Sequence, residues 1–330
     1  MRLLLSEPSK IYFFQKPVSV FVRSCPPIHS NGFSSSCLPQ APPCVIMYVD
    51  PCGDDLGKLV IRKAGDITPL EKPTNEMGTI GSSNGWLTTL NDGVIGFQDN
   101  DLNPKRISLP PLVTLPYCQT QVVTNVAMSS TCPEEEDCVV AVKFLGPQLS
   151  FFRPNSEWID IRIQNPSFLS SHVMYSKKDD VFLIPGSGGH LMGSWDLKKP
   201  DKNPKFRRLR FRKIPFMSSD NKALLDTCCK SEHLVESRTT GEIFLVKLYK
   251  KTIDGGTARV KTEAVMVFKL DDKGSAVYTH DIGHLCIFIT KSEPFCLPST
   301  SFPDMYPNHV VILDLNETSI FNLADLKWNC

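Results

Sequence analysis

Long hydrophobic runs and helical patterns are scarce in this sequence. No stretch approaches the roughly 18 consecutive apolar residues of a membrane-spanning helix, so none is expected. One short helix is predicted between Lys222 and Val235, and helices do not alternate with strands, which argues against a doubly wound nucleotide-binding sheet. The net charge of +1 is also small, so the field of the whole chain predicts no polyanionic partner.

Paired CxxC spacings are absent, although the chain of 330 residues has 12 cysteines. A disulfide framework normally belongs to a small secreted chain with a signal peptide, and neither condition holds here. We therefore interpret the cysteines as free thiols, most of them packed as small apolar residues. Two alternatives stay open: a disulfide or soft-metal site at "CPEEEDC" (Cys132–Cys138), and redox sensing by the strained neighbours Cys228 and Cys229.

Short strands separated by turn residues are abundant instead. The stretch "GWLTTLNDGVIGFQD" holds two apolar runs joined by Asn91–Gly93, which predicts a tight hairpin. Similar turns are predicted at Gly146-Pro147, Asp179-Asp180, Gly186–Gly189, Thr240-Gly241, Asp272–Gly274 and Asn316. This pattern predicts an all-β fold: a sandwich, a barrel or a propeller.

A weak repeat favours the propeller. "SEWIDI" and "GSWDL" place Trp158 and Trp195 37 residues apart, and Trp86 precedes Trp158 by 72 residues, about two such periods. A period of roughly 40 residues with a Trp-acid ending is typical of propeller blades, so about six blades are expected. A long β-sandwich is the alternative architecture.

The N-terminal stretch differs from the rest of the chain. Glu7 is its only acidic residue before Asp50, and its basic residues are Arg2, Lys10, Lys16 and Arg23. Basic, acid-poor, Ser-containing starts are typical of organelle transit peptides. We expect residues 1–45 to be a disordered leader, mitochondrial rather than plastid, with a tail of a cytosolic or nuclear protein as the alternative.

Several segments together resemble the plant-specific KIB-type β-propeller family: "GSSNGWL", "RISLPPL", "HLVES" followed by "TGEIFLVK", "VFKLD" and "DIGHLCIFITKSEPFCLPSTSFPDMYPNHV". The resemblance implies one propeller domain over residues 55–328. It marks these motif residues, which we expect to be structural: Gly81, Asn84, Gly85, Trp86, Asp281, Gly283, Phe288, Phe302 and Pro303.

Members of that family often carry an F-box, which links the propeller to a ubiquitin ligase. Residues 1–50 have too many prolines and too few leucines at helical spacing for an F-box. The chain therefore resembles the organelle-directed branch that lacks this module, and binding to the ligase adaptor is not expected. A substrate receptor for a ubiquitin ligase remains the alternative function.

The stretch from His280 to Cys286 raises the possibility of zinc, because histidine and thiolate are preferred zinc ligands. The two histidines, His280 and His284, need a helix to share one face, and Gly283 lies in a strand-like segment. We interpret this stretch as structural, with Leu285, Ile287 and Ile289 directed to the core. "PGSGGH" likewise predicts a tight loop, since Pro185 occupies the glycine position of a nucleophile elbow.

The segment Lys198–Lys213 is strongly basic, with nine cations and one acid in sixteen residues. Arg208, Arg210 and Arg212 alternate with Leu209 and Phe211, so one strand would present three guanidinium groups on one face. The partner-binding hypothesis names Arg207, Arg208, Arg210, Arg212 and Lys213. An acidic protein, a nucleic acid and a merely solvated edge strand all stay open.

No acid, base and nucleophile assemble by motif anywhere in the sequence. We therefore expect a non-enzymatic protein-interaction module of an organelle that needs no cofactor or metal. The partner is an unknown protein, nucleic acid is the less favoured partner, and membrane insertion is not expected.

Overall fold

The protein is described here from a computed structural model. The structure describes these residues: 44–49, 58–63, 70–73, 79–98, 105–116, 122–196, 204–253, 259–290, 293–301, 305–314 and 317–326. Residues 1–43 of the expected leader, Phe302, Pro303 and Asn316 therefore lie outside the described residues.

The first two four-stranded sheets come early in the chain. The first blade contains β4 (Thr79–Ser83), β5 (Trp86–Asn91), β6 (Val94–Gln98) and β7 (Arg106–Pro111). The second blade contains β8 (Val123–Met128), β9 (Val140–Phe144), β10 (Gln148–Phe152) and β11 (Ile159–Arg162). In both, each strand pairs antiparallel with the next strand in the sequence.

Three further blades follow. The third contains β12 (Met174–Ser176), β13 (Val181–Pro185), β14 (Leu191–Asp196) and β15 (Lys205–Arg208). The fourth contains β16 (Arg210–Arg212), β17 (Cys229–Glu236), β18 (Ile243–Ile253), β19 (Arg259–Leu270) and β20 (Ser275–Thr279). The fifth contains β21 (Leu285–Thr290), β22 (Phe295–Pro298), β23 (His309–Asp314) and β24 (Glu317–Asn322).

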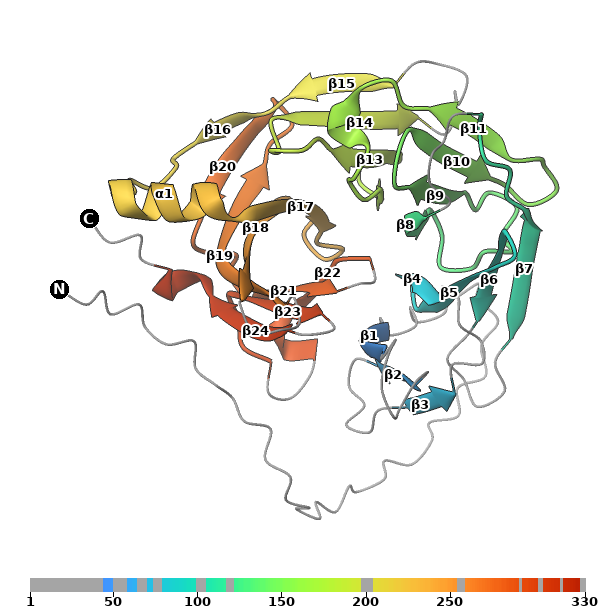
Figure 1. Ribbon diagram of the computed structural model, residues 1–330, viewed down its shortest axis with the longest axis horizontal. Coiled ribbons are helices and arrows are strands. Elements are labelled where there is room, and N and C mark those ends of the chain that lie inside the picture. The colour runs from blue at the N-terminus through green and yellow to red at the C-terminus, as the bar shows by residue number, and fades with distance from the viewer. Residues whose placement is uncertain are drawn as a thin grey trace, which may run out of the picture. The chain divides into compact units, whose positions relative to one another are not determined.

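The blades follow one another around a common centre (Figure 1). One edge strand of each blade contacts the corresponding strand of the next, in the order β4, β8, β12, β17 and β22. These are the inner strands of a β-propeller, which confirms the predicted fold class.

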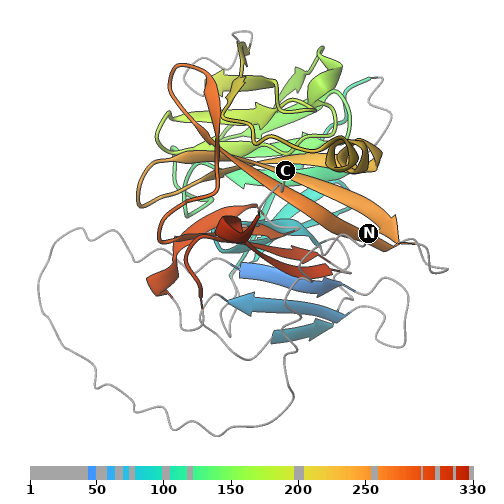
Figure 2. The same ribbon diagram turned by 90° about the vertical axis from the view of Figure 1, so that its left-hand side faces the viewer.

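The blade count was predicted too high, because the described sheets give five blades of four or five strands rather than about six. Dividing the length by a typical blade overlooks the long hairpin of the fourth blade, whose β18 and β19 have 11 and 12 residues. A separate sheet has only three strands: β1 (Cys44–Val49), β2 (Lys58–Lys63) and β3 (Leu70–Pro73). Its strands lie side by side in Figure 2, and β1 contacts β4 of the first blade and β23 of the fifth.

Apolar clusters fill the space between neighbouring blades. Phe97 and Val140 belong to the cluster between the first and second blades, and Phe151 meets Phe182 between the second and third, with ring centroids 5.2 Å apart. Two more clusters separate the third, fourth and fifth blades. Because both faces of a sheet are covered, every residue of β9 and β10 is buried.

The predicted turns are confirmed wherever the structure describes them. Asp92 and Gly93 have φ of 49° and 79°, which gives the hairpin turn that Asn-Asp-Gly favours. The loop Gly186–Gly189 joins β13 to β14, and Gly188 and Gly189 also have positive φ. Turn chemistry was therefore a sound guide to the ends of strands.

The tryptophan repeat has no structural counterpart. Trp86 begins the second strand of its blade, Trp158 precedes the fourth strand of the next, and Trp195 lies in the third strand of the third blade. Trp86 and Trp158 donate hydrogen bonds to the carbonyls of Thr131 and Pro110 at 2.8 and 3.0 Å. The spacing is coincidental, because equivalent positions would recur at the same place in every blade.

The helix α1 (Ser219–Thr227) is shorter and earlier than predicted, because the second half of the expected helix forms strand β17. Ser218 caps its first turn by accepting a hydrogen bond from the amide of Asn221. Three 3-10 turns complete the described elements: η2 (Pro166–Phe168), η3 (Ser299–Ser301) and η4 (Leu323–Asp325). Among the described helices, none has the length and apolar character to cross a membrane.

Candidate functional site

Residues 198–203 of the basic segment lie outside the described residues, and its described part, residues 204–213, forms two strands rather than the single strand expected. Residues of β15 pair with β14 at the outer edge of the third blade, whereas β16 pairs parallel with β20 at the outer edge of the fourth (Figure 1). Leu209 lies between them and is 4% exposed; its amide donates to the His190 carbonyl at 2.8 Å. The segment therefore crosses from the rim of one blade to the rim of the next.

The predicted alternation of side chains persists across this crossing. Arg208, Arg210 and Arg212 are exposed, Leu209 is buried, and Phe211 packs partly buried against the core between the blades. Three guanidinium groups therefore line one rim of two neighbouring blades, followed by the exposed Lys213. We call Arg208, Arg210, Arg212 and Lys213 the arginine rim.

Arg207 does not belong to this rim. Its side chain is half-buried, and its Cδ atom lies 3.4 Å from the position that a Cβ on Gly274 would occupy. The Arg207 Nη1 atom also donates a hydrogen bond to the Asp272 carbonyl at 3.2 Å. The structure thus gives Arg207 a contact within the protein, to the turn between β19 and β20.

Phe211 fixes the orientation of the arginine rim. Its ring centroid lies 4.7 Å from that of Phe268 and 4.8 Å from that of His190, both edge to face. The Lys247 ammonium lies 4.5 Å from the same centroid, a distance that suits a cation–π contact. Because Phe211 is held from several sides, its neighbours Arg210 and Arg212 must point outward.

Asn84, from the "GSSNGWL" motif, ties three blades together. It adopts a left-handed turn with φ of 50°, and its Nδ2 atom donates to the carbonyls of Met128 at 3.1 Å and Ser130 at 2.9 Å. Its Oδ1 atom accepts a hydrogen bond from Arg238, in the turn between β17 and β18. The side chain therefore joins the first blade to the second and the fourth.

Ser83 extends this network to the fifth blade. Its hydroxyl donates to Glu293 Oε2 at 2.7 Å, across 210 residues of sequence. Burial raises the pKa of the Glu293 carboxyl, and the charge of Arg238 opposes that change. The first and last blades are thus connected by a hydrogen bond to a partly buried carboxyl.

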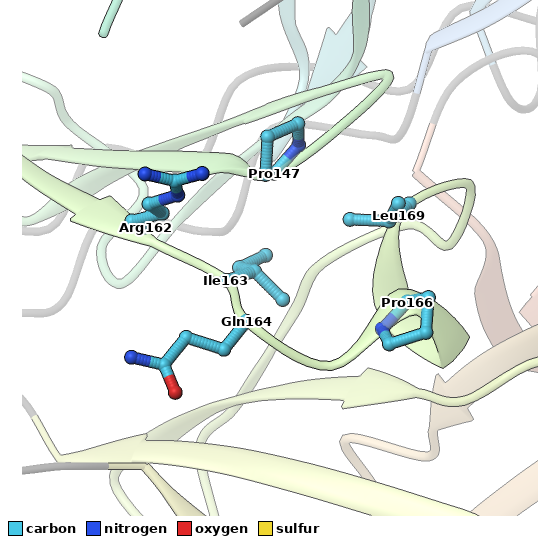
Figure 3. A pocket seen from close by; sticks show the side chains of 6 residues that line it. All are labelled: Pro147, Arg162, Ile163, Gln164, Pro166 and Leu169. Carbon is cyan, nitrogen blue, oxygen red and sulfur yellow. The ribbon is translucent and has the colours of Figure 1, made fainter. Parts of the chain in front are cut away.

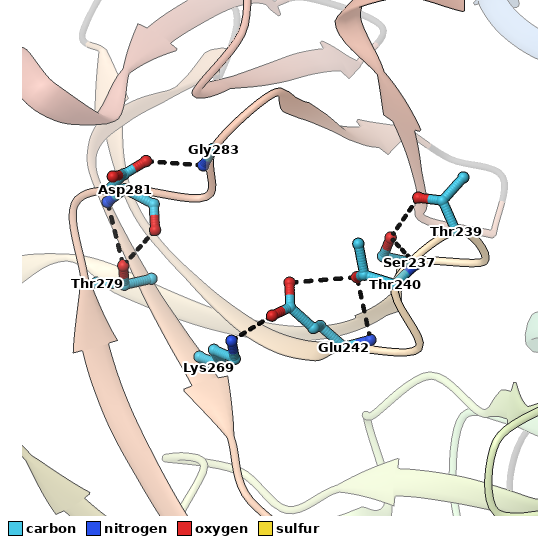
Figure 4. Close-up of polar contacts among 8 residues, drawn as sticks. All are labelled: Ser237, Thr239, Thr240, Glu242, Lys269, Thr279, Asp281 and Gly283. Atoms are coloured by element: carbon cyan, nitrogen blue, oxygen red, sulfur yellow. Dashed lines mark hydrogen bonds and ion pairs between the residues drawn. The ribbon is translucent and has the colours of Figure 1, made fainter.

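The Asp281 and Gly283 motif positions stabilise a turn before the fifth blade. The Gly283 amide donates to Asp281 Oδ1 at 2.7 Å, as Figure 4 shows beside the polar turn of Thr240 and Glu242. Asn308 reaches the same turn, accepting from the Ile282 amide at 2.9 Å and donating to the His280 carbonyl at 3.0 Å. Asn308 belongs to the motif "DIGHLCIFITKSEPFCLPSTSFPDMYPNHV", but no sequence pattern indicates this contact.

The remaining described motif residues have packing positions. Gly81 and Gly85 are buried in the hairpin that holds Asn84, and both have positive φ. Phe288 stacks on Phe295 with centroids 4.8 Å apart and planes 11° apart.

The histidines of the stretch from His280 to Cys286 do not form a zinc site with its thiol. His280 and His284 are exposed, whereas Cys286 is 1% exposed and burial raises its pKa to about 12. Leu285, Ile287 and Ile289 join the core as expected. No cluster of three or more metal-ligating side chains occurs among the described residues. Cys132 and Cys138 are free thiols, as are Cys228 and Cys229.

Two buried basic side chains, Lys143 and His233, and the partly buried His172 were not anticipated from the sequence. The rings of His172 and His233 meet edge to face with centroids 5.6 Å apart, and no described group bonds to either Nδ1 atom. Burial lowers the pKa of His172 to about 4 and that of His233 to about 3. The nearby Lys143 is 0% exposed and donates to the carbonyls of Gly146 and Leu169 at 3.0 Å. No sequence signal distinguishes these residues from surface cations.

A cavity of about 350 Å³ lies beside β11 and η2 (Figure 3). Its lining residues are Pro147, Arg162, Ile163, Gln164, Pro166 and Leu169. The lining combines one guanidinium and one amide with apolar groups, so it holds no side chain that could serve as a nucleophile or a general base near neutral pH.

A comparison with known protein families matches residues 59–322 to the KIB1-4 beta-propeller. The chain belongs to the KIB1-4 β-propeller family. The matched region contains all five blades and ends at the last residue of β24. A comparison with curated proteins found no match.

Distant likenesses to solved structures were found. Apo AztD from Citrobacter koseri is 12% identical with a TM-score of 0.36, and the match covers 73% of this chain and 55% of AztD. Virginiamycin B lyase from Staphylococcus aureus is 8% identical (TM-score 0.29; 61% of this chain, 69% of the other). Hsv2 from Kluyvelomyces marxianus is 11% identical (TM-score 0.26; 68% and 90%). Similarities at this level say nothing about what this chain of the KIB1-4 family binds.

The Asn84 network yields the first prediction. Asn84→Ala removes two hydrogen bonds to carbonyls of the second blade, so we expect it to lower the free energy of unfolding. Asn155→Ala is the matched control, because Asn155 is exposed and also left-handed, with φ of 59°. The loss at Asn84 should exceed that at Asn155 by about 1–3 kcal/mol in denaturant unfolding. Equal losses would show that Asn84 matters only for its backbone conformation.

The buried histidines yield a pH prediction. Their folded pKa values lie below the ordinary 6.5, so the unfolded chain takes up protons first as the pH falls. The contribution of these histidines to the free energy of unfolding should therefore be complete above pH 6.5 and decline as the pH falls toward 4. His172→Asn and His233→Asn should each flatten this decline, whereas His284→Asn, at an exposed position, should not. An unchanged slope in both buried variants would contradict the assignment.

Proposed function

We propose that this β-propeller is a non-enzymatic protein-interaction module and that the arginine rim is part of its contact surface. The observation that supports this most is the exposure of Arg208, Arg210 and Arg212 on one face of two joined edge strands, with Phe211 held beneath them. Propellers commonly act as interaction modules, and fold alone does not name the partner.

Arginine suits this task better than lysine would. Its planar guanidinium group can bind a carboxylate through two parallel hydrogen bonds, and it is more weakly hydrated than an ammonium. Arginine is accordingly enriched at protein interfaces, where lysine is depleted. The rigid packing of Phe211 reduces the freedom that the neighbouring backbone would lose on binding.

The chemistry of the remaining described groups favours binding over catalysis. Burial raises the pKa values of the thiols of Cys138, Cys286 and Cys296 and lowers those of the imidazoles of His172 and His233, so these groups are neutral near pH 7. None of them lines the cavity beside β11 and η2, whose lining offers no nucleophile. An enzyme would need such groups within reach of a bound substrate.

The arginine rim can be tested by charge reversal in the full chain. We expect the triple variant Arg208→Glu, Arg210→Glu, Arg212→Glu to lose the proteins that the tagged wild type captures from plant cells. Its fold should survive, because all three side chains are exposed. The matched control reverses three exposed cations on other strands and turns, Arg162, Lys177 and Lys251, and should keep the captured proteins.

Two results would redirect the proposal. Unchanged capture by the triple variant would remove the arginine rim from the contact surface. Capture of the ubiquitin-ligase adaptor by the wild type would support the substrate-receptor function known for the family's F-box members instead.

We also propose that the module works in mitochondria, on the strength of the basic, acid-poor composition of residues 1–45. Expression with a C-terminal tag should yield a mitochondrial protein whose N-terminus, by sequencing, begins between about Arg23 and Pro51. A full-length cytosolic or nuclear protein would contradict this location.

A further inference from the structure

The strands that carry the arginine rim are edge strands. In the described pairings β15 pairs with β14 and β16 pairs with β20, each along one side, and no further strand is paired along the other side. A strand at the edge of a sheet presents N–H and C=O groups that a further strand can bind. Two such edges here lie in succession, separated by one residue.

One hydrogen bond shows to which side each residue of β16 directs its N–H and C=O groups. The Arg210 amide donates to the Gly274 carbonyl at 2.9 Å, so Arg210 turns its polar backbone groups toward β20. Polar groups of successive residues in a strand point to opposite sides. Phe211 therefore directs its N–H and C=O outward, away from β20, while its ring stays in the core.

Exposed apolar side chains accompany the cations. Phe206 and Ile214 are each 51% exposed, and Phe216 is 72% exposed. Phe206 stacks on the buried Phe168 with centroids 5.4 Å apart, so its ring is held in place. The surface from Lys205 to Phe216 thus offers positive charge, apolar contact and backbone hydrogen-bonding groups together.

The charge identifies the chemistry of an incoming strand. The nine residues Lys205–Lys213 include six cations and no acid, so a second copy of this edge would be repelled. A strand with alternate carboxylates would place them opposite the guanidinium groups, and apolar residues near its ends could meet Phe206 and Ile214. Single-stranded nucleic acid would match the charge but would leave the outward N–H and C=O groups of Phe211 without a peptide backbone to pair with.

We propose that the arginine rim binds an acidic peptide segment of a partner protein, an inference that rests on the proposed function. The segment adds as an extended strand beside β16. Main-chain hydrogen bonds would supply register and the arginines would select acidic residues, as in other proteins that bind a peptide at a sheet edge. Because the charges are exposed, the affinity should fall as salt is raised.

The probe is a synthetic peptide of about ten residues in which glutamate alternates with valine, labelled for fluorescence anisotropy with the full chain. We expect saturable binding that weakens about tenfold or more in the triple charge-reversal variant. The variant with Arg162, Lys177 and Lys251 reversed should bind as the wild type does. A peptide of the same length and alternation, with lysine in place of every glutamate, should not bind.

Backbone pairing is tested by methylating alternate peptide nitrogens. Methylation along one edge of the peptide should abolish binding, whereas methylation along the other edge should leave it intact, because a strand pairs through one edge at a time. Equal binding of both methylated peptides would overturn strand addition but leave the arginine rim as a contact surface. A peptide that binds the triple variant as tightly as the wild type would overturn both. Binding of a single-stranded oligonucleotide but not of the acidic peptide would overturn the peptide assignment.

Discussion

The rest of the structure depends on one constraint: each central sheet must bury both of its faces. A strand such as β9, in which every residue is buried, cannot exist at the surface of a two-layer sandwich without exposing apolar side chains. Neighbouring sheets on both sides meet this requirement, and repeating the arrangement leads to a ring. The loops and outer strands are then the parts left free to contact other molecules. This is why the arginines of β15 and β16 lie on the rim.

The turn residues allowed much of the fold to be predicted from the sequence. Glycine and aspartate at positions such as Asp92 and Gly93 dictate left-handed turns, so the ends of strands could be located from the sequence. The number of blades could not, because it depends on strand length and on which strands pair, and neither is a local property. The tryptophan spacing was misleading for the same reason, since Trp86, Trp158 and Trp195 occupy different positions in their blades. Residues from Cys229 onward, where a helix was expected, form β17 instead, because pairing with β18 outweighs their helical propensity.

The candidate site was predictable in composition but not in architecture. Alternation of Arg208, Leu209 and Arg210 correctly indicated which side chains are exposed, because period two persists wherever the chain is extended. The transfer from one sheet to the next at Leu209 depends on hydrogen bonds to His190 and Gly274, which are distant in sequence. The same limit applies to Asn84. Its motif marked it as important to the family, but only the fold reveals that its amide bonds to a neighbouring blade.

Burial of thiols between blades has a chemical consequence. Burial raises the pKa of Cys138 to about 11 and those of Cys286 and Cys296 to about 12. Thiols react with oxidants and alkylating reagents as thiolates, and at neutral pH on the order of one in ten thousand or fewer of these groups would be ionised. Among the described cysteines, the exposed Cys229 and the partly exposed Cys132 are therefore the ones open to reagents in the folded chain. Burial thus protects most of the described thiols from oxidation. If the blades separated, these thiols would become accessible, and more of them would react with a thiol-directed label.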